Sequence, residues 1–591
     1  MCGIFGYVGP STKAASIVLK GLKDLEYRGY DSWGIAAVPA GKASKIVVKK
    51  KTGKIGNAKL DGFPNSSFAF GHTRWATHGG VTDINAHPHL DCTGKIAIIH
   101  NGIMENYQEI KERLTKIGHR FVSQTDTEVA VHLIEEYAKH MLFSKAVQKA
   151  FNEMEGLNAF IVMNTENRQF VAVRSGSPLV LGFGDRENFL ASDAAAILPY
   201  TKQVHFLEDD EMAIVSEKGA MIFNARTGEH IKPRKQLLTW SPSQVEKGSF
   251  PFFMLKEIHE QPGIIADIAA DADDKAIELA TRIQNADGVY LIGCGTAAHA
   301  CMAGSILFSK PGGILPHAAP ASEVDSLMPF LTKKSVVLAL SQSGETMDTL
   351  EAVRAAKKQG ATIIAVVNVM GSTLYRESDE QLLIGAGPEK GVASTKAFTG
   401  KIAHLVLLSY ALAGQVKAGQ KLLTQTVRVA KEVLAKSSVA KIQALAKKIK
   451  NKEHVYVIGR GMSYPTALEA ALKIKEISYI HAEGFAAGEL KHGVIALVED
   501  GTPCISFLPN DDMYGANLAG AMEMKARGGF IIGVSHKPHE VFDEYIPVDD
   551  AGEATIIPNV MVSQLLAYYL TIERGFDPDM PRNLAKSVTV K

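Results

Sequence analysis

Hydrophobic and polar positions divide this chain of 591 residues into two regions of different character. Over residues 2–230, short apolar runs such as 68–70 and 96–99 lead directly into polar, glycine-rich clusters. Helical spacing of apolar residues interrupts this pattern near 12–26 and 126–139. Short strands broken by glycine-rich loops predict an α+β domain, and loops at strand ends are where binding and catalytic residues gather.

In the rest of the chain, buried-strand patterns alternate with helical patterns. Residues 289–292 and 455–458 are apolar runs that each precede a glycine turn and an alanine-rich helical stretch. The glycines that close these runs, Gly293 and Gly459, lie 166 positions apart. This repeat predicts two copies of one α/β unit. Alternating strands and helices predict a parallel sheet in each copy, with ligands at the carboxyl ends of the strands.

A second similarity points to the same duplication. Residues 321–323, Ala-Ser-Glu, resemble His-Ala-Glu at 481–483, and the two glutamates lie 160 positions apart. Between the two regions the chain becomes polar and rich in proline, which is typical of a linker. The expected organisation is a first domain over 2–230, a linker over 231–256, α/β units over 257–430 and 431–577, and a C-terminal tail over 578–591.

Composition and charge are those of an ordinary globular protein. Apolar residues make up 46% and charged residues 21%, and a net charge of +1 gives no field that would recruit nucleic acid or an acidic membrane. The five cysteines form no C-x-x-C pair, which favours a reducing, cytoplasmic location. We expect no signal peptide and no membrane span. Histidines and cysteines show no metal-ligand spacing, so we expect neither a metal nor an organic cofactor.

Cys2 is a candidate nucleophile because it follows the initiator methionine. If that methionine is removed, the free α-amine, with a pKa of about 7.7–8, can serve as the base for the adjacent thiol. Taken alone, Cys2 could equally be an ordinary buried cysteine. However, residues 2–4, 25–32, 71–79 and 100–103 together resemble the glutaminase domain of class II glutamine amidotransferases, which are N-terminal-nucleophile hydrolases.

That resemblance implies a glutamine site. Arg74 can hold the α-carboxylate with its planar guanidinium, and Asp126 can bind the α-ammonium. Asn101 and the Gly102 backbone N–H can form an oxyanion hole. Taken alone, Asn101 and Gly102 could form a hairpin turn, and Arg28 and Asp126 could form surface ion pairs. The glutamine-binding residues implied by the resemblance are Arg28, Arg74, Trp75, Thr77, His78 and Asp126, with Trp75 as the gate of an ammonia channel.

One departure from the family pattern stands in this region. Trp33 occupies the position after Tyr-Asp-Ser where the family usually has a small residue. A bulky ring at that position could crowd the loop.

A serine-rich turn at residues 341–346 follows an apolar run and precedes a helical pattern that ends at Lys358. Hydroxyl groups and free N–H groups at a helix N-terminus bind anions, although the same residues could simply cap the helix. The turn lacks the lysine and spacing of a Walker motif, so a single phosphate is indicated. Residues 341–346 and 391–396 resemble loops of the sugar-isomerase fold. The phosphosugar-binding residues implied by this resemblance are Thr296, Ser341, Gln342, Ser343, Thr346, Val392 and Ser394.

Glu469, Lys473 and Glu476 are spaced i, i+4 and i+7, so they share one face of a largely apolar predicted helix. Buried carboxylates beside an amine point to acid–base chemistry, and the alternative is a solvated salt-bridge stripe. Taken alone, His492 would be structural, and Lys586, in the terminal tail, would be solvated.

From Cys2 to the C-terminal Lys-Ser-Val-Thr-Val segment, the chain resembles the amidotransferases that aminate a ketose phosphate. The resemblance implies that Lys586 forms a Schiff base with the ketose C2 and that Glu476 moves a proton between C1 and C2. Lys473 would tune this relay, and His492 from a neighbouring subunit would assist ring opening. It also implies glutamine and fructose 6-phosphate as substrates, glucosamine 6-phosphate and glutamate as products, and a homodimer or larger oligomer.

Some features leave other functions open. Ala297 and Ala298 follow the Gly-Cys-Gly-Thr turn at 293–296. Bacterial relatives often have serine at the first of these two positions, so one sugar contact is expected to be missing. Another class II amidotransferase is the second hypothesis, because Val-Asp-Asp at 548–550 resembles a pyrophosphate site, although the glycine-threonine loop that should follow is absent. A non-catalytic phosphosugar sensor is the third, but it would not need Cys2 or Lys586.

Overall fold

A computed structural model describes residues 2–588 except 42–44, 239, 241 and 272. The chain divides into two compact units between Glu246 and Lys247. The described residues from Ala585 onwards group with the first unit, and residues 247–584 form the second.

The first unit contains two antiparallel sheets. The eight-stranded sheet has the order β15 (Gln236–Leu237), β11 (Gln203–Phe206), β9 (Val180–Phe183), β10 (Asn188–Ala191), β1 (Gly3–Val8), β4 (Phe68–Arg74), β2 (Ser32–Ala37) and β3 (Val47–Thr52). The seven-stranded sheet has the order β14 (His230–Ile231), β13 (Gly219–Asn224), β12 (Glu211–Ser216), β8 (Phe170–Arg174), β7 (Asn158–Asn164), β6 (Ile96–Gly102) and β5 (His89–Leu90). The helices are α1 (Ala14–Asp24), η1 (Glu26–Arg28), α2 (Tyr107–Lys116), α3 (Asp126–Ala138), α4 (Phe143–Glu153), η2 (Ala194–Ala196) and α5 (Pro242–Val245).

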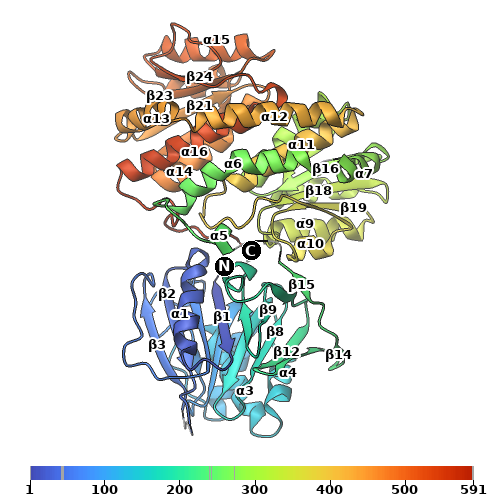
Figure 1. The fold of residues 1–591 in the computed structure, drawn as a ribbon, viewed down its shortest axis with the longest axis vertical. Helices are drawn as coiled ribbons and strands as arrows, with labels where there is room; N and C mark the ends of the chain where they lie inside the picture. Colours follow the sequence, from blue (N-terminus) through green and yellow to red (C-terminus); the bar gives the residue numbers. More distant parts are fainter. Residues whose placement is uncertain (1, 42–44, 239, 241, 272, 589–591) are drawn as a thin grey trace. The chain divides into compact units, whose positions relative to one another are not determined.

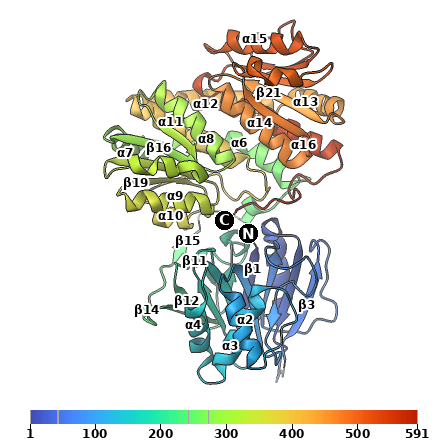
Figure 2. The same cartoon turned by 180° about the vertical axis from the view of Figure 1, so that it is seen from behind.

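These elements form four layers, because successive side chains along each strand point to opposite faces of its sheet. On β1, Ile4 belongs to the core between the two sheets, whereas Phe5 belongs to the core under α1. On β6, Ile99 faces the other sheet and Ile98 packs with α2, α3 and α4. Because strand side chains alternate with period two, each strand serves two cores at once. The helices therefore cover the outer faces of a two-sheet sandwich (Figures 1 and 2).

The second unit contains two parallel sheets of five strands each. The first has the order β17 (His317–Pro320), β16 (Gly288–Gly293), β18 (Ser335–Ser341), β19 (Thr362–Val367) and β20 (Glu380–Leu383). The second has the order β22 (His481–Ala486), β21 (His454–Gly459), β23 (Pro503–Leu508), β24 (Phe530–Ser535) and β25 (Glu544–Pro547). The α-helices are α6 (Phe253–Ala270), α7 (Asp273–Gln284), α8 (Thr296–Ser309), α9 (Met347–Lys358), α10 (Thr373–Glu377), α11 (Lys396–Leu412), α12 (Val416–Val433), α13 (Lys436–Ile449), α14 (Ser463–Ser478), α15 (Tyr514–Lys525) and α16 (Ile556–Glu573). The 3-10 turns are η3 (Ala321–Ser326), η4 (Met328–Phe330), η5 (Leu490–His492), η6 (Val494–Leu497) and η7 (Gly552–Ala554).

The two parallel sheets have the same strand order, as the duplication predicted. Gly293 and Gly459 end the equivalent strands β16 and β21. The two segments of the second similarity are not equivalent positions, because 321–323 lie in η3 beyond strand β17, whereas 481–483 open strand β22. The duplication itself is confirmed. One large apolar core joins the helices between the two sheets, and α9 and α15 cover the outer faces.

Several local predictions need correction. Helices α2 and α4 were missed, because each presents only a narrow apolar stripe to the core. The polar residues of 71–74 and 100–102 belong to strands β4 and β6, not to loops after them. Strand β15, inside the expected linker, pairs with β11 of the eight-stranded sheet.

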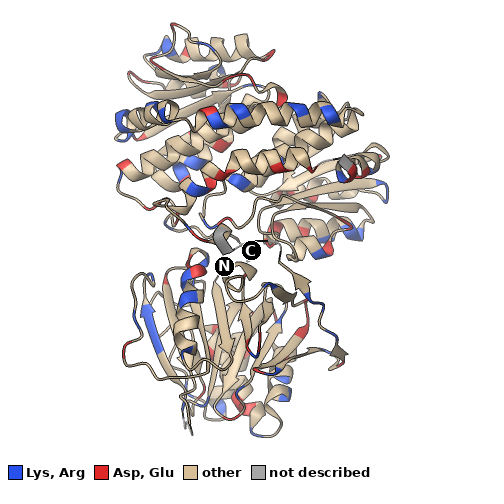
Figure 3. Cartoon of the chain, in the orientation of Figure 1, with Lys and Arg blue, Asp and Glu red and all other residues tan. Residues whose placement is uncertain are grey.

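The segment Gly552–Glu573 is long and apolar enough to cross a membrane by length and composition alone, although the sequence analysis predicted no membrane span. However, 89% of its most apolar window is buried inside the fold, so the apolar surface of α16 is used as core. Acidic and basic residues are interspersed over the elements of each unit (Figure 3), in keeping with the net charge of +1.

Candidate active sites

A pocket in the first unit gathers most of the residues expected to bind glutamine. They come from the start of β1, the end of β4, the end of β6 and the start of α3, segments that the sandwich brings together. The pocket is lined by Cys2, Arg74, Trp75, Thr77, His78, His87, His100, Asn101, Gly102, Thr125, Asp126, Thr127 and Ser177.

Cys2 meets the end of strand β4 and Asn101. The Trp75 backbone N–H donates to Cys2 Sγ at 3.2 Å, and Asn101 Nδ2 donates to the Cys2 carbonyl oxygen at 3.0 Å. Burial raises the pKa of the Cys2 thiol, and the Trp75 N–H and Arg74 only partly oppose this effect. The thiol therefore needs a base before it can attack a substrate.

His72, on strand β4, fixes the orientation of the Asn101 side chain. Its Nε2 lies 3.0 Å from both the His100 carbonyl oxygen and Asn101 Oδ1. Both partners are acceptors if the Asn101 amide is oriented in this way, so Nε2 carries the proton. Burial lowers the pKa of His72 to about 3, so the ring is neutral at physiological pH. Asn101 Nδ2 is thereby directed toward Cys2.

Gly102 closes strand β6 in a conformation that only glycine adopts readily. Its φ is +144°, and a Cβ at this position would lie 2.1 Å from the Leu157 carbonyl oxygen. Because Asn101 and Gly102 pair with β7 as strand residues, they do not form a hairpin turn. The strand geometry, rather than a turn, places these two residues beside Cys2.

Two charged side chains of the pocket suit the two charged ends of an amino acid. Arg74 is buried and donates to the carbonyl oxygens of His78, Gly79 and Gly80, so it also holds the following loop. Asp126 begins α3, and its carboxylate oxygens accept the N–H groups of Met104 and Thr127 at 2.8 and 3.0 Å. Anchored charges of opposite sign can orient a zwitterion without rearrangement.

Arg28 lies outside the pocket lining. Its Nη1 forms a buried ion pair with Asp193 Oδ2 at 2.8 Å. A Cβ on the neighbouring Gly29 would lie 2.7 Å from the Arg74 carbonyl carbon, so this segment packs directly against the end of β4. Arg28 therefore supports the pocket wall. Trp33 is buried in the core under α1, so its bulk does not crowd the loop.

Sequence reasoning missed five residues of this pocket: His87, His100, Thr125, Thr127 and Ser177. His100 bridges two segments, because its Nδ1 lies 2.9 Å from Thr127 Oγ1 and its Nε2 lies 2.9 Å from Asn158 Oδ1. Ser177 lies in a Ser-Gly-Ser-Pro turn after β8, and this turn is a sequence signal that could have been used.

In the second unit, helix α14 carries a buried network of charges. Lys473 Nζ donates to Glu476 Oε2 at 2.6 Å and lies 3.5 Å from Glu469 Oε1. Glu469 and Lys473 are completely buried, so the alternative of a solvated stripe is wrong. Lys475, between these residues in the sequence but on another face of α14, is exposed.

The first repeat completes this network from helix α8. Thr296 Oγ1 accepts from Lys473 Nζ at 3.1 Å and donates to Glu469 Oε1 at 3.1 Å. His299, which sequence reasoning missed, places Nδ1 2.8 Å from Glu469 Oε2. Both repeats therefore contribute to one site, and the alanines at 297 and 298 are followed by a polar residue that reaches it.

Electrostatics keep Lys473 charged. Burial alone would lower the pKa of its ammonium group, but the carboxylates of Glu476, Glu469 and Glu389 raise that pKa above its ordinary value. Burial alone would raise the pKa of Glu469, but Lys473 and His299 lower it. An ammonium between carboxylates can pass and receive protons, but it cannot act as a free amine nucleophile.

The turn at 341–346 joins strand β18 to helix α9. Gly344 donates its N–H to Ser341 Oγ at 2.9 Å, and a Cβ there would lie 2.0 Å from Ser372 Oγ. Thr346 is the N-cap of α9 but makes no capping bond with its side chain. The half-buried Gln342, Ser343 and Thr346 thus stand at an N-terminus that can take an anion.

The loop at 389–395 lies beside the network of α14, because Glu389 acts on Lys473. Glu389 Oε2 accepts from Ser394 Oγ at 3.2 Å, and Glu389 Oε1 accepts the Thr395 N–H at 2.9 Å. The Val392 N–H donates to the Asp579 carbonyl oxygen at 3.1 Å, so it is already engaged.

Two predicted residues lie outside helices α8 and α14. His492 is exposed on the turn η5, and within the described part of the chain no hydrogen bond or ion pair links it to Glu476. Lys586 is half-buried in the C-terminal segment that groups with the first unit. Within the second unit, the Arg582 N–H donates to Tyr479 Oη at 2.8 Å, and Tyr479 lies three residues beyond Glu476 at the end of α14.

Comparison with known proteins connects both sites. Residues 53–223 match a glutamine amidotransferase domain, and residues 282–410 and 448–574 match the SIS domain. The chain is 44% identical to the glutamine–fructose-6-phosphate aminotransferase (isomerizing) of Thermococcus kodakarensis and 43% identical to that of Pyrococcus horikoshii, over the full length of each. The chain belongs to the glutamine–fructose-6-phosphate aminotransferase (isomerizing) family.

Structural comparison supports the same membership. The C-terminal domain of glucosamine-fructose-6-phosphate aminotransferase from Francisella tularensis matches 57% of this chain and all of that domain, with a TM-score of 0.52 and 31% identity. As a member of this aminotransferase family, the chain is an enzyme with an N-terminal amidotransferase domain and two SIS domains. The hypotheses of a different class II amidotransferase and of a non-catalytic sensor are thereby wrong.

Proposed function

We propose that Cys2 releases ammonia from glutamine and that the α14 site, together with Lys586, transfers it to fructose 6-phosphate with isomerisation. The observation that carries the proposal is the placement of Cys2, Asn101 and Gly102 in one pocket with Arg74 and Asp126. In this scheme Cys2 Sγ attacks the side-chain carbonyl carbon of glutamine, the amide nitrogen leaves as ammonia, and water hydrolyses the thioester to glutamate. Asn101 Nδ2 and the Gly102 N–H stabilise the oxyanion.

The base for Cys2 is its own α-amine after removal of Met1. The raised pKa of the buried thiol supports the need for such a base. Intact-mass measurement of active protein tests this step, and a retained methionine on fully active protein would exclude the amine as base.

In the sugar half, the Lys586 amine attacks C2 of the open-chain ketose and water leaves. Ammonia then replaces the lysine at C2, and Glu476 moves a proton from C1 to C2, which yields glucosamine 6-phosphate. Lys473 is unsuited to be the nucleophile, since its carboxylate neighbours keep it protonated. The Arg582 N–H is hydrogen-bonded to Tyr479 at the end of α14. Lys586 lies four residues further along the chain, so at most about 14 Å of extended backbone separates it from this anchor.

Borohydride reduction in the presence of fructose 6-phosphate tests Lys586 directly. The sugar should become attached to the peptide that contains Lys586, and Lys586→Arg should lose both labelling and synthesis while retaining glutamine hydrolysis. The matched control is Lys475→Arg, because Lys475 is exposed on α14. Labelling of Lys473, or near-normal synthesis by Lys586→Arg, would refute the assignment.

We propose that His492 acts in the site of a second subunit, so the enzyme is at least a homodimer. The support is that His492 is exposed and does not contact the Glu476 network of its own chain. Co-expression of His492→Ala and Glu476→Gln chains tests this: mixed dimers should recover part of the ammonia-dependent synthesis that each homodimer lacks. No recovery from verified mixed dimers would place His492 in its own chain's site. We also propose a cytoplasmic location, which the five free cysteines support.

A further inference from the structure

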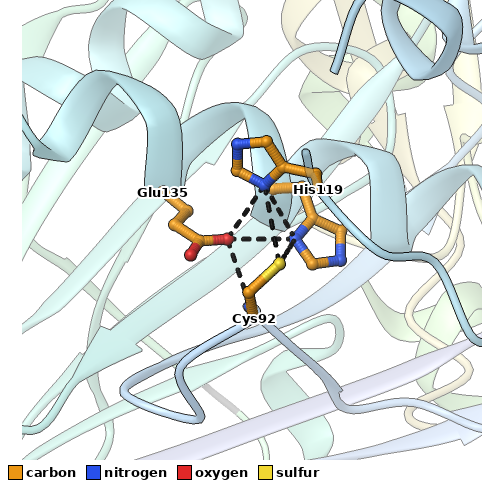
Figure 4. A group of neighbouring side chains, drawn as sticks. Cys92, His119 and Glu135 are labelled. Carbon is orange, nitrogen blue, oxygen red and sulfur yellow. Dashed lines mark hydrogen bonds and ion pairs between the residues drawn. The ribbon is translucent and has the colours of Figure 1, made fainter. Parts of the chain in front are cut away.

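A compact group of metal-ligating side chains lies in the first unit, separate from the glutamine pocket. It consists of Cys92, His119, His132 and Glu135, and one ligand atom from each lies within 4.8 Å of all the others. Cys92 follows β5, His119 follows α2, and the last two lie one turn apart on α3. Figure 4 shows the side chains of Cys92, His119 and Glu135 pointing toward one another.

Five of the six distances between the four ligand atoms lie between 3.0 and 3.7 Å, close to the edges of a metal-centred tetrahedron. The two histidine Nδ1 atoms are 3.4 Å apart, and Cys92 Sγ lies 3.7 Å from His119 Nδ1 and 3.5 Å from His132 Nδ1. Glu135 Oε2 lies 3.1 and 3.0 Å from the same two nitrogens. Ligands at about 2.0–2.3 Å from a tetrahedral zinc ion lie about 3.3–3.6 Å from one another.

The outer ring nitrogens of the two histidines face carboxylates. His119 Nε2 lies 3.0 Å from Glu136 Oε2, and His132 Nε2 lies 3.8 Å from Glu128 Oε1. Glu128 is itself held by the N–H groups of residues 122 and 123. For His119, the carboxylate behind the ring places the ring proton on Nε2 and leaves Nδ1 free to ligate. The 3.8 Å separation at His132 is an ion-pair distance and is too long for a direct hydrogen bond.

Four electron-pair donors that converge on one point repel one another unless a cation lies between them. The alternative is a metal-free cluster in which both rings are protonated at Nδ1 and donate to Glu135 Oε2. In that case Glu135 Oε2 would accept three hydrogen bonds, one from each ring and one from the Cys92 N–H at 3.1 Å.

We propose that Cys92, His119, His132 and Glu135 bind a zinc ion as a closed, four-ligand structural site. One thiolate, two imidazoles and one carboxylate are a donor set that suits zinc. Cys92 is exposed, and it lines an open cavity together with His132, so an ion can enter from solvent. The expectation of no metal rested on sequence spacing, and here the ligands are separated by 27, 13 and 3 positions.

The site would stabilise the first unit rather than take part in chemistry. It would tie the turn after β5 and the end of α2 to helix α3, which begins at Asp126 in the glutamine pocket. The proposal stands independently of the roles proposed for Cys2 and Lys586.

Metal analysis of the full-length protein, purified without chelator, tests the proposal. We expect about one zinc per chain, and after chelator dialysis Co²⁺ should give tetrahedral d–d bands and a sulfur-to-cobalt charge-transfer band. Cys92→Ser should lose the charge-transfer band. His119→Gln should weaken zinc binding by about 100-fold. His140→Gln, an exposed histidine just beyond α3, is the matched control and should bind zinc normally.

A second measurement on unaltered protein covers variants that fail to fold. All three tryptophans lie in the first unit, so their fluorescence reports its unfolding alone. Excess zinc should raise the unfolding temperature of the chelator-treated protein, whereas ammonia-dependent synthesis should stay unchanged. Absence of zinc and cobalt uptake, or equal binding by His119→Gln and His140→Gln, would overturn the proposal and favour the metal-free cluster.

Discussion

The two catalytic regions differ in how they use buried polar groups. Around Cys2, the side chains that orient the proposed oxyanion donor are neutral: burial lowers the pKa values of His72 and His100, and Asn101 is an amide. On α14, the buried groups are charged, with Lys473 held between Glu469 and Glu476. Fixed neutral dipoles suit a transient oxyanion, whereas a charged relay suits a reaction whose main task is to move protons. The two sites thus differ in the charge of their buried side chains, in keeping with the different chemical steps proposed for them.

The largest expected effect is that of removing the nucleophile. Cys2→Ala should reduce glutamine-dependent synthesis by roughly 10⁴-fold or more, because no other group can form the thioester. Synthesis from high ammonium chloride should remain near normal, since Cys2 takes no part in the proposed sugar chemistry and the α14 network lies in the other unit. The control is Cys504→Ala, a buried cysteine of strand β23. If ammonium restores no product, the two sites are not independent.

Glu476→Gln should affect the other half. Loss of the proton carrier should lower synthesis from either nitrogen source by about 10²–10⁴-fold, whereas glutamine hydrolysis continues. Both rates are measured on the same preparation, with exposed Lys475→Gln as the control. Equal loss of glutamine hydrolysis would show that the charged network also supports the first unit.

Asn101→Ala tests the neutral side of the comparison. Removal of one oxyanion donor should lower kcat for glutamine hydrolysis by about 10²–10³-fold and leave KM almost unchanged. Steady-state glutamate release gives both constants. A rise in KM at constant kcat would instead assign Asn101 to substrate binding.

The smallest effect concerns pH and stability. The pKa of His72 in the fold, about 3, lies below its ordinary value of 6.5, so the unfolded chain binds the proton more readily. The stability that the neutral ring contributes is complete above pH 6.5 and is lost as the pH falls toward 3. His72→Gln keeps a donor near Asn101 but does not titrate, so its free energy of unfolding should fall less steeply between pH 6 and 5.

The expected difference in slope is about 1 kcal/mol per pH unit. Urea unfolding followed by tryptophan fluorescence measures it, because all three tryptophans lie in the first unit. A variant with the same slope as the unaltered protein would show that His72 is not the titrating group.

The sequence by itself determined many of the local elements and the chemistry that they carry, although helices α2 and α4 were missed. Short apolar runs located β4 and β6, and helical spacing placed Glu469, Lys473 and Glu476 on one face of α14. The spacing between Gly293 and Gly459 established the repeat. These features depend on residues a few positions apart or on motifs, so they can be read without knowing the fold.

Only the tertiary structure decided which distant residues meet. Strand pairing, and not a turn, holds Asn101 and Gly102, and the core between the two repeats brings Thr296 and His299 to Glu469. The fold likewise brings Cys92 and His119 close to His132 and Glu135 of helix α3. Such contacts depend on sheet order and helix packing over separations of tens to hundreds of residues, which local periodicity does not encode.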